Sequence, residues 1–160
     1  EFDKEFYEIL TKNPEYTKAV FAIDRDVPKP RKDIAKWNEV KDYFSYMFNE
    51  LYVPCFELPE NIQKADALAF LESYKAVYNA ADDKQEWFNK IKAIAPTLGF
   101  AAETKEYKQN PDAFKGSAGD LSTVLRLAIT GRRNTPDLCS IMQVLGQDEV
   151  IKRIDTILRG

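Results

Sequence analysis

Arginine side chains near the C-terminus are the groups of this chain best suited to binding a polar ligand. Arg126 lies within the apolar run 124–130 (VLRLAIT), and Arg132 and Arg133 directly follow Gly131. A guanidinium stays charged and presents its donors in a rigid fork, so it can meet a phosphate or the acceptor edge of a nucleic-acid base. The pattern therefore predicts a local binding site.

Each of these arginines also has a structural interpretation. A charge in an apolar run is costly unless it is paired, so Arg126 could form an ion pair with Asp120 or Asp137. Arg132 and Arg133 are expected in an exposed turn, where charged side chains are usually solvated. The functional alternative for this pair is contact with phosphates, which positions RNA without reading its sequence.

The residues needed for most catalytic chemistry are missing from the sequence. The chain contains no histidine, which removes the commonest general base and the commonest catalytic metal ligand. It also lacks a Gly-rich phosphate loop and a nucleophile elbow. Cys55 and Cys139 have no metal-ligand spacing and are expected to be buried or half-buried reduced thiols. We therefore expect no catalytic site, no metal and no cofactor in this chain.

Charge is distributed unevenly along the chain. The net charge is -3, from 23 Lys and Arg against 26 Asp and Glu, so bulk charge does not indicate nucleic acid. Residues 1–60 hold nine basic against thirteen acidic side chains, whereas residues 115–133 hold four basic side chains against one acidic. Any RNA site must therefore be local. No apolar run approaches the length of a membrane span and no secretory signal is present, so we expect a cytoplasmic protein that binds no membrane.

The hydrophobic pattern predicts an all-α, bundle-like fold. Apolar residues recur at three-to-four spacing, and convincing strand-type alternation is absent. Helices are expected near residues 2–12, 14–24, 33–48, 61–78, 83–94, 135–146 and 147–158, with only a short helix in the polar stretch 101–119. Asn61, Asp83 and Thr135 are the expected N-caps, with Pro136 at the first position of its helix. A boundary after Ala81 divides the chain into two small helical subdomains, 1–81 and 82–160.

Two C-terminal segments resemble a known family. The segments LRLAITGRRNTPDL (125–138) and LGQDEVIKRI (145–154) resemble the C-terminal end of bacterial glutamyl-tRNA synthetases, class I enzymes whose all-helical C-terminal half reads the tRNA anticodon. Residues 29–48 and 86–100 are similar to the opening and the middle of the same half, so the resemblance covers nearly the whole chain. One departure is Val124, which stands where the family commonly has a proline before the Leu-Arg pair.

The resemblance implies roles for several side chains. Arg126 would contact an anticodon base, and Leu138 would pack against an anticodon nucleotide. Arg31 and Lys32, at the start of the helix expected from Asp33, would face the anticodon loop. Apart from the resemblance, Lys105, Lys108 and Lys115 interleave with Tyr107 and Phe114, a pattern that can neutralise phosphates and stack bases. With Arg132 and Arg133 these lysines are the predicted phosphate contacts.

The resemblance also implies a partner and a parent enzyme. The partner would be the tRNA of glutamate, alone or together with that of glutamine, bound by a monomer that does not bind DNA. The chain lacks the His-Ile-Gly-His and Lys-Met-Ser-Lys-Ser signatures of class I synthetases and starts without a methionine. ATP and Mg²⁺ would then be used by a preceding catalytic domain that is not in this chain. The alternative is a helical protein-interaction module that keeps the fold without the RNA role, which fits the acidic first third.

Overall fold

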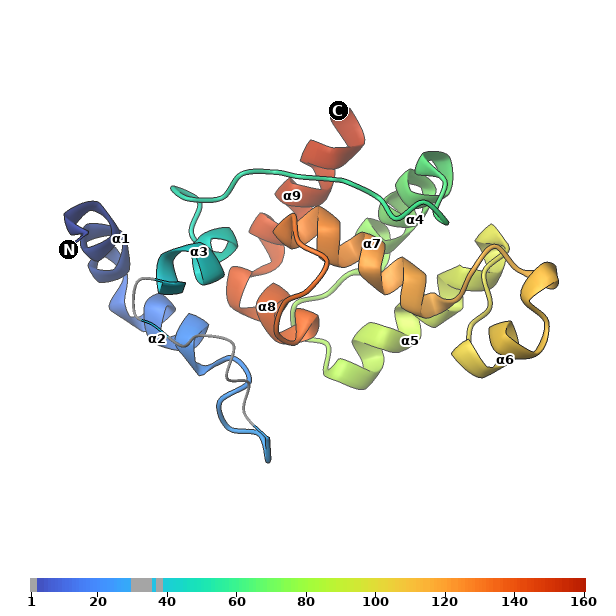
Figure 1. Cartoon of the computed structure of the whole chain (residues 1–160), viewed down its shortest axis with the longest axis horizontal. Helices are drawn as coiled ribbons and strands as arrows, with labels where there is room; N and C mark the ends of the chain where they lie inside the picture. The colour runs from blue at the N-terminus through green and yellow to red at the C-terminus, as the bar shows by residue number, and fades with distance from the viewer. Residues whose placement is uncertain (1–2, 30–35, 37–38) are drawn as a thin grey trace.

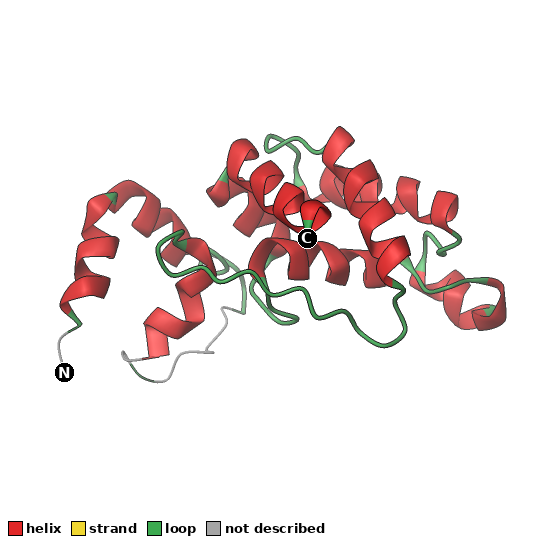
Figure 2. Ribbon diagram, turned by 90° about the horizontal axis from the view of Figure 1, so that it is seen from above, coloured by secondary structure: helices red, strands yellow, loops and turns green. Residues whose placement is uncertain are grey.

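The chain folds into helices joined by loops, as predicted (Figures 1 and 2). This computed structural model describes residues 3–29, 36 and 39–160, and over them the fold is all-α, with a single isolated bridge between Ala101 and Ser117. The α-helices are α1 (Lys4–Lys12), α2 (Pro14–Ala22), α3 (Val40–Phe44), α4 (Lys64–Val77), α5 (Lys84–Ile94), α6 (Thr104–Gln109), α7 (Ala118–Thr130), α8 (Leu138–Leu145) and α9 (Gln147–Arg159). Short 3-10 helices follow α3 (η2, Ser45–Met47), α5 (η3, Ala95–Leu98) and α6 (η4, Pro111–Ala113).

Local capping signals set several helix starts. The amide of Phe6 donates to the Asp3 carboxylate at 2.9 Å at the start of α1. Asp83 and Glu86 form a capping box at the start of α5, with the Glu86 amide 2.8 Å from the Asp83 carboxylate. Such caps satisfy amides that have no partner within the helix. The predicted cap at Asp83 is therefore confirmed.

Two other predicted helix starts are wrong. Helix α4 begins at Lys64 rather than near Asn61, whose side-chain amide donates to Asp120 at 3.4 Å. Helix α8 begins at Leu138 and is capped by Asp137, not by Thr135. Before α8, Thr135 and Asp137 can both act as a cap, so the local sequence alone does not choose between them. Before α4, Gln63 takes the N-cap position without a side-chain capping bond. The helix expected over residues 33–48 lies partly outside the described residues, and its described part forms α3 and η2.

The core joins helices from both halves of the chain. Helix α4 packs against α5, α7 and α9, while α8 packs against α9, α5 and α2. Buried side chains such as Phe70, Tyr74, Leu125 and Ile154 share one apolar cluster. Helices α1 and α6 lie at opposite ends of the molecule, and the connection from η2 to α4 runs across α7 and α9 (Figure 1). Among the described helices none combines the length and the apolar character required to cross a membrane.

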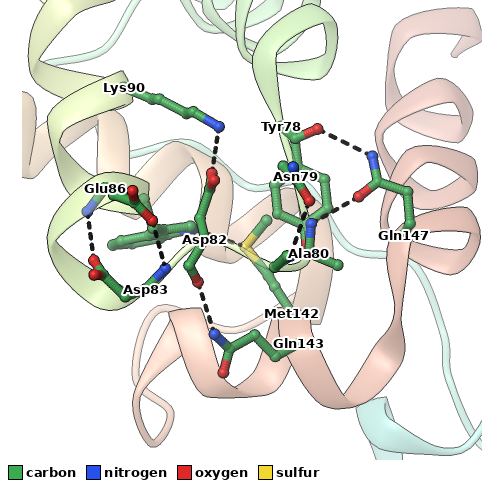
Figure 3. A network of polar contacts seen from close by, with 12 residues as sticks. Tyr78, Asn79, Ala80, Asp82, Asp83, Glu86, Lys90, Met142, Gln143 and Gln147 are labelled. Carbon is green, nitrogen blue, oxygen red and sulfur yellow. Dashed lines mark hydrogen bonds and ion pairs between the residues drawn. The ribbon is translucent and has the colours of Figure 1, made fainter.

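The connection between α4 and α5 is clamped by glutamines of the C-terminal helices (Figure 3). The Gln143 side chain donates to the carbonyl of Asp82 at 2.8 Å. Gln147 donates to the carbonyl of Tyr78 at 3.0 Å and accepts from the amide of Ala80 at 2.8 Å. These bonds, and the packing of α4 on α5, α7 and α9, cross the position predicted as a subdomain boundary. The division after Ala81 stays a prediction.

A buried arginine on α9 joins three parts of the chain. The Arg153 side chain is only 2% exposed. Its guanidinium lies 3.9 Å from the ring centre of Tyr52, and it donates to Glu149 (2.9 Å), the carbonyls of Tyr46 and Ile129 (2.7 Å each) and the Asn49 side chain (3.1 Å). A buried charge is tolerated only when it is paired and hydrogen-bonded in this way. Arg153 therefore ties α9 to the end of α7 and to the residues around η2.

Replacing Arg153 by methionine should unfold the protein more easily. The substitution keeps much of the side-chain volume but leaves Glu149 and several buried acceptors without their donor, so we expect a loss of about 3 kcal/mol or more in the free energy of unfolding. Urea denaturation followed by circular dichroism measures it. The exposed Arg159 of the same helix, changed to methionine, is the control. Equal stability of the two variants would contradict the linking role of Arg153.

Tyr74 should tolerate loss of its hydroxyl. This side chain is fully buried, its hydroxyl has no hydrogen-bond partner in the described part of the chain, and burial raises its pKa. We expect Tyr74→Phe to leave the free energy of unfolding unchanged or to raise it by up to about 1 kcal/mol. Tyr16→Phe is the matched comparison, since the Tyr16 hydroxyl donates to the carbonyl of Met47. Thermal melts should show a lower midpoint for Tyr16→Phe only.

Candidate nucleic-acid interface

Helix α7 carries Arg126 in the middle of a regular segment. The helix starts after Ser117, whose amide donates to the Asp120 carboxylate at 2.7 Å. Val124 lies in the helix interior and is fully buried. The valine that replaces the family proline therefore continues a helix that began upstream, because its amide can join the helical bonding. Asp120, one of the two predicted partners of Arg126, contributes to the cap of α7.

The Arg126 side chain is half-buried and reaches the segment before α8. Its Nη1 donates to the carbonyl of Pro136 at 2.9 Å, to the carbonyl of Thr135 at 3.3 Å, and to the Thr135 hydroxyl. These contacts hold the guanidinium at a defined place between α7 and α8. The carboxylate of Asp137, the other predicted partner, forms an ion pair with Lys84 at 2.7 Å.

The turn after α7 depends on a glycine and places Arg132 against the N-terminal third. Gly131 adopts the left-handed conformation (φ 70°), and a Cβ there would lie 3.3 Å from the amide nitrogen of Cys55. Arg132 donates to the Ser45 hydroxyl at 2.9 Å and to the carbonyl of Asp42, and its guanidinium lies 5.3 Å from the Tyr46 ring centre. The expectation of an exposed Arg132 is therefore wrong, because the side chain is half-buried in these contacts.

Arg133 differs from its neighbour. It is exposed, as predicted, and within the described residues its guanidinium makes only long hydrogen bonds, 3.4 Å to the carbonyls of Glu57 and Leu58. Such contacts at the surface contribute little to stability, since water competes for the same donors. Arg133 is thus the better placed of the two for a phosphate.

Carboxylates occupy the start of α8. The Asp137 carboxylate accepts from the Ser140 amide at 3.0 Å, and the Asp137 amide donates to the Asp24 carboxylate at 2.9 Å. Burial raises the pKa of Asp137, but the hydrogen bonds from Lys84 and Ser140 outweigh it and hold the pKa below its ordinary value. A phosphate bound at this helix end would compete with these carboxylates.

The other predicted contact residues are dispersed. Leu138 belongs to the core and is 1% exposed, so little of it can reach a nucleotide. Lys105 and Lys108 are exposed on α6, whereas Lys115 forms an ion pair with Asp66 at 2.7 Å. Arg31 and Lys32 lie outside the described residues. The roles assigned to all of these side chains stay predictions.

An open groove of about 660 Å³ lies beside Arg126. Arg126 and Ser122 of α7 line one wall, and α5 contributes Gln85, Phe88 and Asn89 to the other. The segment before α8 and its first residue, Leu138, also line the groove. Lys84, Lys92 and Asp137 also line it, so the groove joins a half-buried guanidinium, neutral polar side chains and an aromatic ring to further charged groups.

Comparison with known proteins gives the family. Residues 4–158 match the family described as anticodon binding domain. This chain belongs to that family. It is 42% identical over 158 residues to the glutamate–tRNA ligase of Clostridium perfringens, 41% over 163 residues to that of Clostridium beijerinckii, and 39% over 160 residues to that of Sorangium cellulosum. These alignments cover 96%, 99% and 99% of this chain, but only 29%, 30% and 28% of the respective ligases.

Two features of the site and its surroundings in this anticodon-binding domain were not predicted from the sequence. Arg153 occupies a position of the apolar face of α9, one residue before Ile154 and three after Val150, and this spacing could have indicated a buried arginine. No comparable sequence pattern indicated that α5 would form a wall of the groove. Gln85 and Asn89 are ordinary polar residues of a helix surface, and only the packing of α5 beside α7 brings them close to Arg126.

The Asp137 cap should make this anticodon-binding domain sensitive to acid. A carboxylate whose pKa is lowered in the folded state stabilises the fold at pH values above its ordinary pKa of 3.8. This contribution disappears as the pH falls through the folded-state pKa. Asp137→Asn should therefore lower the free energy of unfolding by about 1 kcal/mol near neutral pH, with the difference shrinking below pH ~4. Urea titrations at several pH values measure it. Asp112→Asn, at an exposed site, should behave like the wild type.

Proposed function

We propose that this anticodon-binding domain binds the anticodon loop of glutamate tRNA as part of a glutamate–tRNA ligase. The observation that carries the proposal is the position of Arg126, which the residues before α8 hold at the wall of an open groove. The family and the names of the relatives support the same function. A guanidinium held by backbone carbonyls loses little conformational freedom when it meets a ligand, which favours selective binding.

Recognition would combine one base contact with several phosphate contacts. Unstacked bases of an RNA loop expose their Watson-Crick edges, and a pyrimidine such as cytosine presents acceptors to which Arg126 can donate. Arg133 and the exposed Lys105 and Lys108 would neutralise phosphates, which adds affinity without reading sequence. Arg132 would act mainly by fixing the turn that carries Arg133, since its donors already bond to residues around η2.

The chemistry of such a ligase would take place outside this chain. The ATP and Mg²⁺ of glutamate activation are assigned to another part of the parent protein. In the described ranges, side chains of Asp, Glu and Cys do not gather in threes as a metal site requires, and the sequence has no histidine. We further propose a cytoplasmic monomer whose nucleic-acid partner is tRNA rather than DNA.

The alternative of a protein-interaction module predicts a contiguous exposed apolar patch. The large apolar side chains exposed in the described residues are Tyr7, Val27, Val53 and Val77, which belong to separate elements. Isolated exposed apolar residues are normal at a protein surface. The groove at Arg126 therefore favours RNA over a protein partner.

Binding of the 160-residue chain to the anticodon stem-loop of glutamate tRNA tests this function. Fluorescence anisotropy at 50 and 200 mM salt, with a stem-loop of altered anticodon bases beside it, measures affinity, selectivity and salt dependence. We expect tighter binding of the cognate RNA and weaker binding at the higher salt, because phosphate contacts release counterions. Equal or absent binding of both RNAs at both salt concentrations would reject the function.

Two arginine substitutions should separate base reading from phosphate contact. Arg126→Ala should cost about 1 to 3 kcal/mol of discrimination between the two stem-loops. Arg133→Ala should weaken the binding of both RNAs alike. It should also reduce the salt slope, the slope of log affinity against log salt concentration, by about one. Circular dichroism of each variant checks that the fold is intact. A uniform loss on Arg126→Ala, with discrimination preserved, would contradict its role as a base reader.

A further inference from the structure

Two neutral amide side chains on α5 lie across the groove from Arg126. Gln85 and Asn89 are four residues apart on the helix, so their side chains are neighbours on one face. Both are exposed, and in the described part of the chain neither side chain has a hydrogen-bond partner. Both line the same groove as Arg126 and Ser122.

The wall that presents these amides is rigid. The capping box of Asp83 and Glu86 fixes the first turn of α5, as Figure 3 shows. The Trp87 indole N–H lies 3.3 Å from the Met142 sulfur on α8, and Ile91 is fully buried. Residues on a helix fixed in this way keep a constant distance from α7. Recognition of a particular ligand edge needs such fixed spacing, whereas general electrostatic attraction does not.

The chemistry of the two walls is complementary. A guanidinium only donates, whereas an amide side chain both accepts and donates. Every nucleic-acid base carries donors as well as acceptors on its pairing edge, so arginine alone leaves the base donors unmatched. Phe88, half-buried on the same helix, adds an apolar surface to the groove. The Lys92 ammonium lies 5.2 Å from its ring centre and is also paired with Glu103 at 2.6 Å. Aromatic and cationic surfaces of this kind suit a base and its phosphate.

We propose that the groove between α5 and α7 binds one unstacked base of the anticodon loop, and that Gln85 and Asn89 are specificity-determining residues opposite Arg126. The amide oxygens accept from the amino or imino group of the base, while Arg126 donates to its acceptors. This inference rests on the proposed function and assigns α5 to the site. The acidic residues of the α5 cap, Asp83 and Glu86, bond to each other's amides. Lys84 and Lys92, which also line the groove, are paired with Asp137 and Glu103, so the two amides are the uncharged polar side chains that α5 offers to a base.

Substitution of the amides tests the proposal in the same stem-loop assay. The double variant Gln85→Ala, Asn89→Ala should bind the cognate RNA roughly 5- to 100-fold more weakly, as expected for lost base-edge contacts. Discrimination should fall while the salt slope stays the same, because no phosphate contact is removed. Gln63→Ala, an exposed glutamine before α4 without a side-chain capping bond, is the matched control and should bind like the wild type.

Nuclear magnetic resonance of the ¹⁵N-labelled chain gives an independent readout. The side-chain NH₂ signals of Gln85 and Asn89 should shift on addition of the cognate stem-loop, whereas that of Gln63 should not. If the wild-type chain binds the RNA but the double variant binds it with unchanged affinity, or the signals of these amides do not shift, the assignment of α5 is overturned. The proposed function would still stand. If the wild-type chain does not bind the RNA, both fall together.

Discussion

The buried guanidinium of Arg153 is the contact on which the arrangement of the chain depends. It bonds to Glu149 of its own helix, to the carbonyl of Ile129 near the end of α7, and to the carbonyl of Tyr46 in η2. The last carbonyls of a helix have no partner within the helix, so Arg153 satisfies one of them while drawing the N-terminal third onto α9. The position of the turn after α7 follows from this anchor.

The arginines in and near the turn after α7 differ in the contacts that they make. Arg132 continues the link to the N-terminal third through Ser45 and Asp42, so its charge mainly serves the fold. Arg133 remains exposed at the surface. Arg126, one helix turn before the end of α7, is held by the carbonyls of Thr135 and Pro136. Neighbouring arginines of similar sequence context thus differ in function because their donors meet different acceptors.

Charge balance also shapes the interface. The chain as a whole is acidic, and the start of α8 holds the carboxylates of Asp137 and Asp24. That helix end therefore disfavours phosphates, and the proposed phosphate contacts lie elsewhere, at Arg133 and at the exposed lysines Lys105 and Lys108. The groove proposed to bind a base opens between α5 and α7, where Gln85, Asn89 and Ser122 are neutral. The lysines of the same wall, Lys84 and Lys92, are paired with Asp137 and Glu103. The neutral side chains can therefore meet a base edge through hydrogen bonds.

The sequence by itself determined the helical class and the cap of α5 at Asp83, because periodicity and capping are local properties. It did not predict helix α7, and it did not determine where α8 begins, since Thr135 and Asp137 can both cap and only the structure shows that Asp137 does so. Nor did it separate Arg132 from Arg133, or show that Arg153 is buried. Only the tertiary structure places α5 beside α7, because the face that a helix presents to its neighbour is set by packing of the whole core.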